Sequence, residues 1–460
     1  MKLSGRLVLV LGLGQSGLAI ARHLVREGAR VRVADSRQQP PGMAAVQSLA
    51  GVELVCGAFS EALLEGVELL AISPGLSPLE PVVQTALARG IKVTGEIELF
   101  ARALNAIAPR PKLIAITGTN GKTTTTSLMG ELCRAAGLET AVAGNISPAA
   151  LDEYLRRIDA GKPAQAWVLE LSSFQLETTE TLAADAATVL NVTDDHLDRY
   201  DGLDGYADAK ARVFDGARAQ VLNRQDARVM AMRRDGMRVL SFGLDAPVYR
   251  DDFGVVESEG GRWLARGDER LMPREQLPLA GDHNVANALA ALALGDAIGL
   301  PMPAMLEGLR AFRGLPHRVE KIAEREDGVE FYDDSKGTNV GATLAALEGL
   351  GRRVVLIAGG DGKGQDFTPL RDAFAAHARA AILIGRDARQ IAEAVAGSGT
   401  ELVFSNDLPT AVREANARAQ QGDVVLLSPA CASLDMFRNY AHRAEVFCDA
   451  VWMLPGVTRK

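Results

Sequence analysis

The sequence predicts an α/β protein with three domains, each built on a parallel sheet covered by helices. Short apolar runs alternate with helical patterns along the 460 residues, as expected for parallel strands joined by helical crossovers. Two glycine-rich loops, at 12–17 and 118–121, each follow an apolar run. The segment 103–112 contains two prolines and is typical of a linker. The expected domains are residues 1–108, 109–313 and 314–460.

The first domain begins with the apolar run 6–12, the turn Gly12–Gly17, a helical stretch and the strand 30–34, which ends at Asp35. A G-x-G-x-x-G turn with an acidic residue about twenty positions later is the fingerprint of Rossmann-like dinucleotide sites. We therefore expect a Rossmann-like domain here. Taken alone, the motif favours an NAD-dependent oxidoreductase, which would leave the loops of the other two domains unexplained. Further strands are expected at 52–55 and 68–73.

The second domain opens with the apolar run 113–116, the loop Gly118–Gly121 and then Lys122-Thr123 at the start of a helix. Backbone N–H groups in such a loop approach a polyphosphate closely. The lysine supplies positive charge to the outer phosphates, and the threonine hydroxyl can bind Mg²⁺. Ile116 stands where the generic P-loop has its first glycine, so this is a shorter variant. An ordinary glycine-rich turn is the simpler alternative. Strand, loop, Lys-Thr and helix nevertheless occur in the order of a P-loop-type ATPase domain.

The second domain continues with strands expected at 167–172, 187–192 and 219–223. Residues 241–280 are interpreted as a peripheral β-rich insertion without a predicted function, and 284–300 as an alanine-rich helix.

Three further features of this domain could carry chemistry. Glu170 lies in an apolar strand, where an acid is either a metal ligand or a salt-bridged structural residue. His196 lies among acidic residues at a strand's carboxyl end, where α/β sheets build their sites; a solvated acidic turn explains this spacing equally well. Tyr206 and Lys210 share a helix face, although spacing alone favours a surface lysine.

The third domain has strands expected at 329–332, 353–358, 380–384 and 423–427, with helices at 338–350 and 408–420. Loops at 334–339, 359–364 and 428–434 follow three of these strands. They place Lys336, Lys363 and free backbone N–H groups at one sheet edge, which suits a small anion such as a carboxylate. For 359–364, plain turn chemistry is a serious alternative.

Composition excludes several classes of function. The net charge of −8 and the lack of a long basic run argue against nucleic acid as a partner. No apolar run reaches the ~20 residues of a membrane helix, and the apolar start leads directly into a glycine turn, as a first strand would. The four cysteines form no C-x-x-C pair, which fits a reducing cytoplasm and no zinc site. We expect a cytoplasmic monomer.

The chain resembles the Mur ligase family from end to end, most closely its MurD type. The segments that carry the resemblance are TGTNGKTT, GNIS, LELSSFQLET, NVTDDHLDRY, GDHNVANALAAL, GLPHRVE, DDSKGTNVGAT, AGGDGKGQDF and SPACASLDMF. The glycine loop is shared with the wider Mur and folylpolyglutamate ligases, whereas ELSSFQLET, DHLDRY, DSKGTN and SPACASLD are more specific. The common family form of one motif is DSKATN, and Gly337 stands in place of its alanine. Tyr440 stands where the family commonly has a phenylalanine.

The resemblance implies ATP-dependent addition of D-glutamate to UDP-N-acetylmuramoyl-L-alanine, in peptidoglycan precursor synthesis. The UDP part of the substrate would lie at the first domain, against Gly14, Gln15, Ser16, Asp35, Ser36, Arg37 and Ser73. ATP would be bound by Gly118, Thr119, Asn120, Gly121, Lys122, Thr123, Thr124, Asn284, Asn287, Arg318 and Asp334. The glutamate would be held by Lys336, Thr338, Lys363, Ser433, Leu434 and Tyr440.

The resemblance also implies two Mg²⁺ ions. Thr123 and Glu170 would bind the first and His196 the second, while Lys210 would be carbamylated by CO₂ and bridge the metals. Asn145 would contact the substrate or the metal-bound phosphate. Lys122, Asn145, His196 and Lys210 would form the catalytic set.

The implied mechanism is activation of a carboxylate. The substrate carboxylate attacks the γ-phosphate of ATP, and the glutamate amine then attacks the acyl phosphate. Closure of the third domain would exclude water from this anhydride. The same loops could hold either enantiomer of glutamate. A non-catalytic nucleotide-gated protein with this fold, or a ligase for another amino acid, are the remaining alternatives.

Overall fold

The structure, a computed structural model, describes residues 3–195, 199–258 and 260–460. It contains three separate sheets, and the chain divides into two compact units. The first unit contains the first two sheets and Ala288–Arg310; the second contains Arg274–Asn287 and Ala311–Lys460. Within the described residues, no helix has the length and apolar character needed to cross a membrane.

The first sheet is fully parallel in the order β3-β2-β1-β4-β5, which confirms the four strands expected here. The strand order reverses between β1 and β4, so their carboxyl ends form a switch point, the usual place for a ligand in such folds. The strands are β1 (Leu7–Leu11), β2 (Arg30–Asp35), β3 (Val52–Cys56), β4 (Leu69–Ile72) and β5 (Lys92–Gly95). The helices are α1 (Gln15–Arg26), α2 (Met43–Gln47), α3 (Pro81–Ala88) and α4 (Glu96–Asn105), with a 3₁₀ turn at Glu61–Leu64.

The central sheet has the order β14-β13-β12-β11-β10-β9-β6-β8-β7. Its parallel part places β6, which precedes the glycine loop, between β8 and β9. The parallel strands are β6 (Lys112–Thr117), β7 (Thr140–Gly144), β8 (Ala166–Glu170), β9 (Ala186–Val189), β10 (Ala219–Asn223) and β11 (Arg238–Phe242). The helices around it are α5 (Lys122–Ala135), α6 (Ala150–Asp159), α7 (Ser173–Leu176), α8 (Gly202–Ala211), α9 (Ala227–Ala231), α10 (Asp282–Ala297) and α11 (Met302–Ala311).

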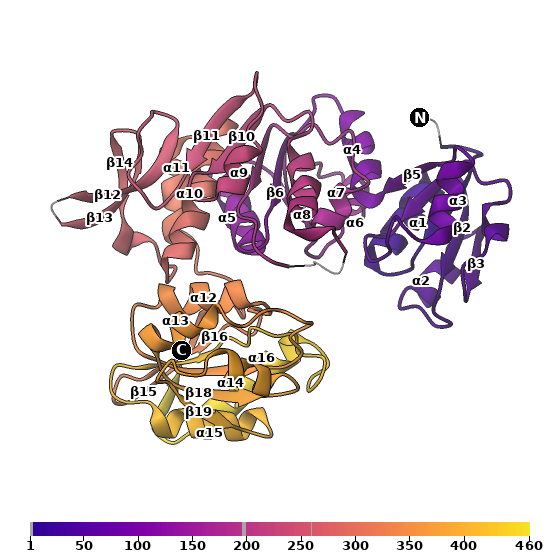
Figure 1. Cartoon of the computed structure of the whole chain (residues 1–460). Helices are drawn as coiled ribbons and strands as arrows, with labels where there is room; N and C mark the ends of the chain where they lie inside the picture. Colours follow the sequence, from indigo (N-terminus) through magenta and orange to yellow (C-terminus); the bar gives the residue numbers. More distant parts are fainter. Residues whose placement is uncertain (1–2, 196–198, 259) are drawn as a thin grey trace. The chain divides into compact units, whose positions relative to one another are not determined.

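The expected β-rich insertion is confirmed as an extension at one end of this sheet (Figure 1). It consists of β12 (Asp252–Ser258), β13 (Gly261–Arg266) and β14 (Glu269–Pro273). These three strands pair antiparallel, so the prediction of purely parallel sheets is wrong here. The reason is connection length: strands joined by a few residues can only fold back antiparallel, whereas a parallel pair needs a long crossover.

The third sheet has the order β19-β18-β17-β20-β16-β15-β21. Alternate residues of β17 face opposite layers: Val354, Leu356 and Ala358 pack with α12 to α14, while Val355 and Ile357 pack with α15 and α16. The strands are β15 (Glu320–Arg325), β16 (Glu330–Asp333), β17 (Val354–Gly359), β18 (Ala378–Ile384), β19 (Glu401–Phe404), β20 (Val424–Leu427) and β21 (Val457–Arg459). The helices are α12 (Val340–Gly349), α13 (Leu370–His377), α14 (Ala388–Ala394), α15 (Leu408–Arg418) and α16 (Tyr440–Trp452). Here too β15 and β21 are antiparallel additions to a parallel core.

Helix α4 joins the first sheet to the central one and occupies part of the expected linker. Its first turn carries Glu96 and Glu98, which are 2% and 1% exposed. Glu96 Oε1 accepts a hydrogen bond from Leu151 N (2.8 Å) at the start of α6, and Glu98 Oε2 accepts from Thr181 N (2.8 Å). Burial raises the pKa of Glu96 to about 7. The junction therefore depends on two buried carboxyl groups.

Candidate active site

The glycine turn of the first sheet lies at the switch point. Gly12 has φ +85°, and a Cβ on Gly17 would lie 1.8 Å from Gly12 O, so the turn and the close packing of α1 both require glycine. Gly14 has open space where a Cβ would stand, and Gln15 and Ser16 begin α1. The turn therefore offers backbone N–H groups at a helix start, the arrangement that favours an anion.

Asp35, at the end of β2, supports this turn. Its carboxylate accepts hydrogen bonds from Leu13 N (2.7 Å) and from the Arg37 backbone and guanidinium, with Arg37 Nη2 at 2.7 Å. The bonds from Arg37 are the largest cause that lowers the pKa of Asp35, to about 2. Ser73 follows β4 on the other side of the turn, where a Cβ on Gly12 would lie 2.9 Å from Ser73 Cβ. Asp35, Arg37 and Ser73 are thus brought together around the glycine turn, with Ser36 exposed between the first two.

The second glycine loop connects β6 to α5 and is clamped by an asparagine. Gly118 and Gly121 have φ +150° and +81°, conformations that glycine adopts at little cost. Asn191, which follows β9, accepts from Asn120 N through Oδ1 (2.8 Å) and donates to Asn120 O through Nδ2 (3.1 Å). Its backbone carbonyl accepts from Thr119 N (2.9 Å). No local sequence pattern gives Asn191 this role, because its partner Asn120 lies 71 residues away in the chain.

The lysine and threonines of this loop lie where the motif predicts. Lys122 begins α5, and its Nζ donates to the carbonyls of Gly118 (2.8 Å) and Thr119 (2.7 Å). Thr123 and Thr124 follow in the first helical turn. The loop thus presents a cation and a helix N-terminus together, which suits a polyphosphate.

Glu170 is the last residue of β8 and lies one strand away from the loop. It is 2% exposed. Its Oε1 accepts a hydrogen bond from Asn145 Nδ2 (2.9 Å), and its backbone O lies 2.2 Å from where a Cβ on Gly144 would stand. Glu170 Oε2 is buried and has no hydrogen-bond partner among the described residues. Leaving a buried carboxylate oxygen without a partner costs free energy. This oxygen is therefore suited to be a ligand of a bound divalent cation.

Lys210, in the last turn of α8, is buried rather than on the surface. It is 1% exposed, its Nζ donates to Gly118 O (2.9 Å), and it lies 4.2 Å from the centre of the Tyr206 ring. The simpler interpretation as a surface lysine is therefore wrong, because α8 packs its Tyr206–Lys210 face against the glycine loop. His196, the remaining predicted member of this set, lies outside the described residues.

The third sheet gathers three loops at the carboxyl ends of its parallel strands. Asp361 and Ala432 exchange backbone hydrogen bonds (3.0 and 2.9 Å), which joins the loops after β17 and β20. Arg443 is fully buried and donates to Ser335 O (2.9 Å) and Cys431 O (3.1 Å), which adds the loop after β16. The lysine of that loop, Lys336, has its Nζ 3.9 Å from the centre of the Tyr440 ring.

The remaining residues predicted to hold glutamate belong to the same three loops or border them. Thr338 lies two residues after Lys336, and Lys363 has φ +52°. Ser433 is buried, whereas Leu434 is 71% exposed. No sequence pattern marks Arg443, since a buried arginine in a helix carries no local signal.

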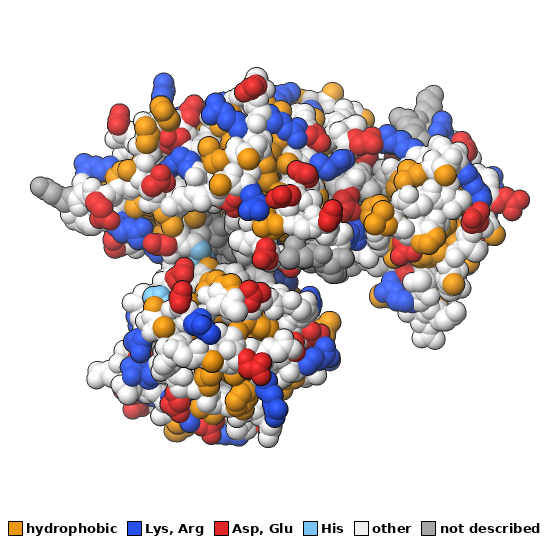
Figure 2. Space-filling model, viewed as in Figure 1, with side chains coloured by type: hydrophobic (Ala, Val, Ile, Leu, Met, Phe, Trp, Pro, Cys, Tyr) orange, Lys and Arg blue, Asp and Glu red, His pale blue; other side chains and the backbone are white. Residues whose placement is uncertain are grey.

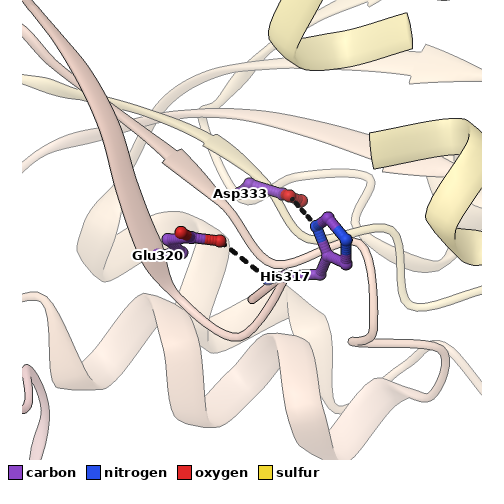
Figure 3. Close-up of side chains that lie close together, drawn as sticks. All are labelled: His317, Glu320 and Asp333. Carbon is purple, nitrogen blue, oxygen red and sulfur yellow. Dashed lines mark hydrogen bonds and ion pairs between the residues drawn. The ribbon is translucent and has the colours of Figure 1, made fainter. Parts of the chain in front are cut away.

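A histidine and two acids beside these loops also lie close together (Figure 3). His317 Nδ1 lies 2.6 Å from Asp333 Oδ2, and His317 N donates to Glu320 Oε2 (3.0 Å). The other Asp333 oxygen accepts from Ser335 N (2.8 Å). The bond to Asp333 raises the pKa of His317. Because both Asp333 oxygens are engaged, we interpret the group as a brace for the loop after β16.

The residues expected around the adenine and ribose belong to the second unit. Asp334 is buried, which raises its pKa to about 7, and the charge of Arg318 acts in the opposite direction. Its Oδ2 accepts from Ser428 Oγ (2.7 Å). Asn284 and Asn287 lie on one face of α10, with Asn287 Nδ2 3.2 Å from Asn284 Oδ1. The glycine loop, Glu170 and Lys210 belong to the first unit.

Comparisons with known families match three successive parts of the chain. Residues 6–95 match the Mur ligase MurD-like N-terminal domain, 116–295 the Mur ligase middle domain, and 317–431 the Mur ligase glutamate ligase domain. The glycine fingerprint at 12–17 thus belongs to a Mur-type domain rather than to a dehydrogenase.

Two curated relatives cover nearly the whole chain. A protein of Aromatoleum aromaticum named UDP-N-acetylmuramoylalanine--D-glutamate ligase is 58% identical over 460 residues, 99% of both chains. A protein of Burkholderia mallei with the same name is 55% identical over 487 residues, covering 97% of this chain and 96% of the relative.

Solved structures agree on the fold. The UDP-N-acetylmuramate-alanine ligase MurC of Thermotoga maritima has a TM-score of 0.59 at 19% identity, covering 96% of this chain and 98% of its own. MurF of Acinetobacter baumannii has a TM-score of 0.58 at 19% identity, covering 93% and 88%. With three domain families in the expected order and full-length relatives above 50% identity, the chain belongs to the Mur ligase family.

Proposed function

We propose that the protein is an ATP-dependent ligase that joins D-glutamate to UDP-N-acetylmuramoyl-L-alanine, with release of ADP and phosphate. The observation that carries the proposal is the full-length similarity to relatives with this name. The site agrees with it, because three features lie at one sheet edge: a glycine loop with a lysine, a buried lysine, and a buried acid with an oxygen unpartnered in the described part of the chain. The reaction belongs to peptidoglycan precursor synthesis, and hence to cell wall growth, cell shape and division.

Each domain would bind one substrate. Residues 1–108 would bind the UDP part, residues 109–313 would bind ATP, and residues 314–460 would bind the glutamate. The UDP diphosphate would meet the helix start at Gly14, Gln15 and Ser16. The α-carboxylate and side chain of the amino acid would meet Lys336 and Lys363, since two lysines suit a dicarboxylate. The protein would act as a cytoplasmic monomer. On the face shown in Figure 2, positive and negative side chains are interspersed, which is in keeping with small-molecule substrates.

Two Mg²⁺ sites are part of the proposal. Thr123 and Glu170 would hold the first ion, His196 the second, and a CO₂-derived carbamate on Lys210 would contribute an anionic bridge. The Oε2 of Glu170, which no described residue hydrogen-bonds, fits such an ion, and the buried Nζ of Lys210 already reaches the glycine loop. Bound Mg²⁺ would supply positive charge during phosphoryl transfer.

The residues of the chain then serve two successive steps. In the first, the carboxylate of the UDP substrate forms a bond to the γ-phosphorus of ATP, and ADP leaves; Lys122 and the loop N–H groups stabilise the charge on the transferred group. In the second, the glutamate amine attacks the acyl carbon and phosphate leaves. Asn145, fixed by Glu170, would orient the substrate or its phosphate.

The test is release of ADP from ATP, Mg²⁺ and UDP-N-acetylmuramoyl-L-alanine with D-glutamate, L-glutamate, other amino acids or none. We expect release that depends on D-glutamate, and a loss of at least about a hundredfold in Lys122→Ala, which removes the cation at the phosphates. Release only with L-glutamate would contradict the substrate. A folded, ATP-binding protein that releases no ADP with any amino acid would contradict the enzymatic function.

A further inference from the structure

Arg199 joins two parts of the first compact unit and has no assigned role. Its guanidinium donates to the backbone carbonyls of Pro74 (3.4 Å) and Leu76 (3.0 Å). It forms an ion pair with Glu177 (Nη2 to Oε2, 2.7 Å), and its carbon Cζ lies 4.1 Å from the centre of the Phe174 ring. The Arg199 side chain is 14% exposed. Its Nε has no hydrogen-bond partner among the described residues, but the bonds from both Nη atoms and the contact with the Phe174 ring hold the side chain in one position.

The loop that Arg199 holds, residues 73–76, lies at the switch point of the first sheet. Ser73 N donates to Leu11 O (2.9 Å), and Leu76 N donates to Ser73 O (3.0 Å). The close approach of Ser73 to Gly12 places this loop against the glycine turn. Under the proposed function, that turn and Ser73 border the UDP part of the substrate. Arg199 therefore reaches from the central sheet to the edge of the substrate site.

The other side of Arg199 leads towards Lys210. Glu177 Oε1 accepts a hydrogen bond from Tyr200 Oη (2.6 Å). The Tyr200 ring stacks on Phe174 (6.0 Å between centres) and tilts against Tyr206 (5.4 Å). Tyr206 in turn lies beneath the Lys210 Nζ. One chain of direct contacts thus runs from the loop 73–76 to the buried lysine.

We propose that Arg199 is a positioning residue: it holds the loop 73–76 in the shape that receives the diphosphate of the UDP-linked substrate, and with Glu177 and Tyr200 ties this loop to Lys210. The inference rests on the proposed function for its substrate. A guanidinium suits the task because its planar fork donates to two carbonyls and a carboxylate at once, which an ammonium cannot do with the same geometry.

The test compares Arg199→Ala and Arg199→Lys with a matched control, Arg22→Ala. Arg22 in α1 pairs with Asp152 in α6 (3.0 Å); it joins the same two sheets without contacting the loop. Calorimetry with UDP-N-acetylmuramoyl-L-alanine alone gives substrate affinity, and steady-state rates give KM and kcat. Hydrogen exchange reports on the amides of residues 73–76.

We expect Arg199→Ala to weaken binding of the UDP substrate at least about tenfold, the loss typical of one charge-assisted hydrogen bond. Arg199→Lys should show a smaller loss, and Arg22→Ala a change below about twofold, as for an exposed ion pair. The KM for ATP should be unchanged in all three, and the amides of the loop should exchange faster only when Arg199 is replaced.

Unchanged affinity in Arg199→Ala, or an equal loss in Arg22→Ala, would overturn the proposal; the second result would reduce Arg199 to a general support of the junction. If Arg199→Ala does not fold, Arg199→Lys carries the same comparison. A wild-type protein that binds the UDP substrate but shows no ADP release with D-glutamate would refute the proposed function and leave the positioning test in force. A wild-type protein that does not bind the UDP substrate would overturn both.

Discussion

Replacement of Asn191 by alanine should weaken ATP binding through loss of order in the glycine loop. The side chain makes two hydrogen bonds to the backbone of Asn120, at 2.8 and 3.1 Å. Each neutral hydrogen bond contributes about 1 kcal/mol net, so the substitution should remove about 2 kcal/mol of loop stabilisation. Because the backbone bond from Thr119 N to Asn191 O remains, the loop should loosen rather than unfold. About 2 kcal/mol corresponds to roughly a thirtyfold loss of ATP affinity.

Asn223→Ala provides a matched control for this prediction. Asn223 ends β10, the strand next to β9, and its side chain also makes two hydrogen bonds, donating to Leu190 O (2.9 Å) and accepting from Gln225 N (3.0 Å). Titration with a fluorescent ATP analogue would give the affinity of each variant, and urea unfolding the stability. Equal ATP affinity in Asn191→Ala and wild type, or an equal loss in Asn223→Ala, would refute the reasoning about the clamp.

Four further variants, one of them a control, test other parts of the structure. Lys210→Ala should nearly abolish turnover, with partial rescue by a small carboxylic acid; full activity would contradict the carbamate. Gly17→Ala should destabilise the protein by about 1–3 kcal/mol in urea unfolding, because the new Cβ meets a backbone carbonyl; Gly14→Ala, with open space, should not, and equal stabilities would contradict this. Glu96 has a pKa raised to about 7 in the folded state, so it binds its proton more tightly when the protein is folded. The folded state therefore loses stability as the pH rises from about 5 to 7 and this proton is lost. Glu96→Gln should therefore gain stability relative to wild type over that range, by up to about 3 kcal/mol, whereas a difference independent of pH would contradict the assignment.

The sequence could predict the elements that depend on local pattern. The apolar runs before both glycine loops became β1 and β6, because a buried parallel strand is a nearly continuous apolar run. The glycine turns were predictable because their φ values and close approaches demand that residue. The candidate residues at the carboxyl ends of strands followed from the topology of parallel sheets, which brings such ends to one edge.

Other features depend on partners far away in the chain. Lys210 seemed a surface residue because nothing within α8 shows that one face packs on the glycine loop. Asn191 and Arg443 act through hydrogen bonds to distant backbone groups, for which sequence spacing carries no signal. The antiparallel strands β15 and β21 are half polar, and β21 has only three residues, so their apolar pattern is too weak to identify them.

The most direct test of the central proposal, activation of a carboxylate by ATP, is an isotope transfer. The alanyl carboxylate of UDP-N-acetylmuramoyl-L-alanine is labelled with oxygen-18 and converted with ATP, Mg²⁺ and D-glutamate. An acyl phosphate intermediate predicts one labelled oxygen in the inorganic phosphate, as detected by mass spectrometry, and one retained in the new amide. Phosphate that carries no label while the amide product forms would contradict the account.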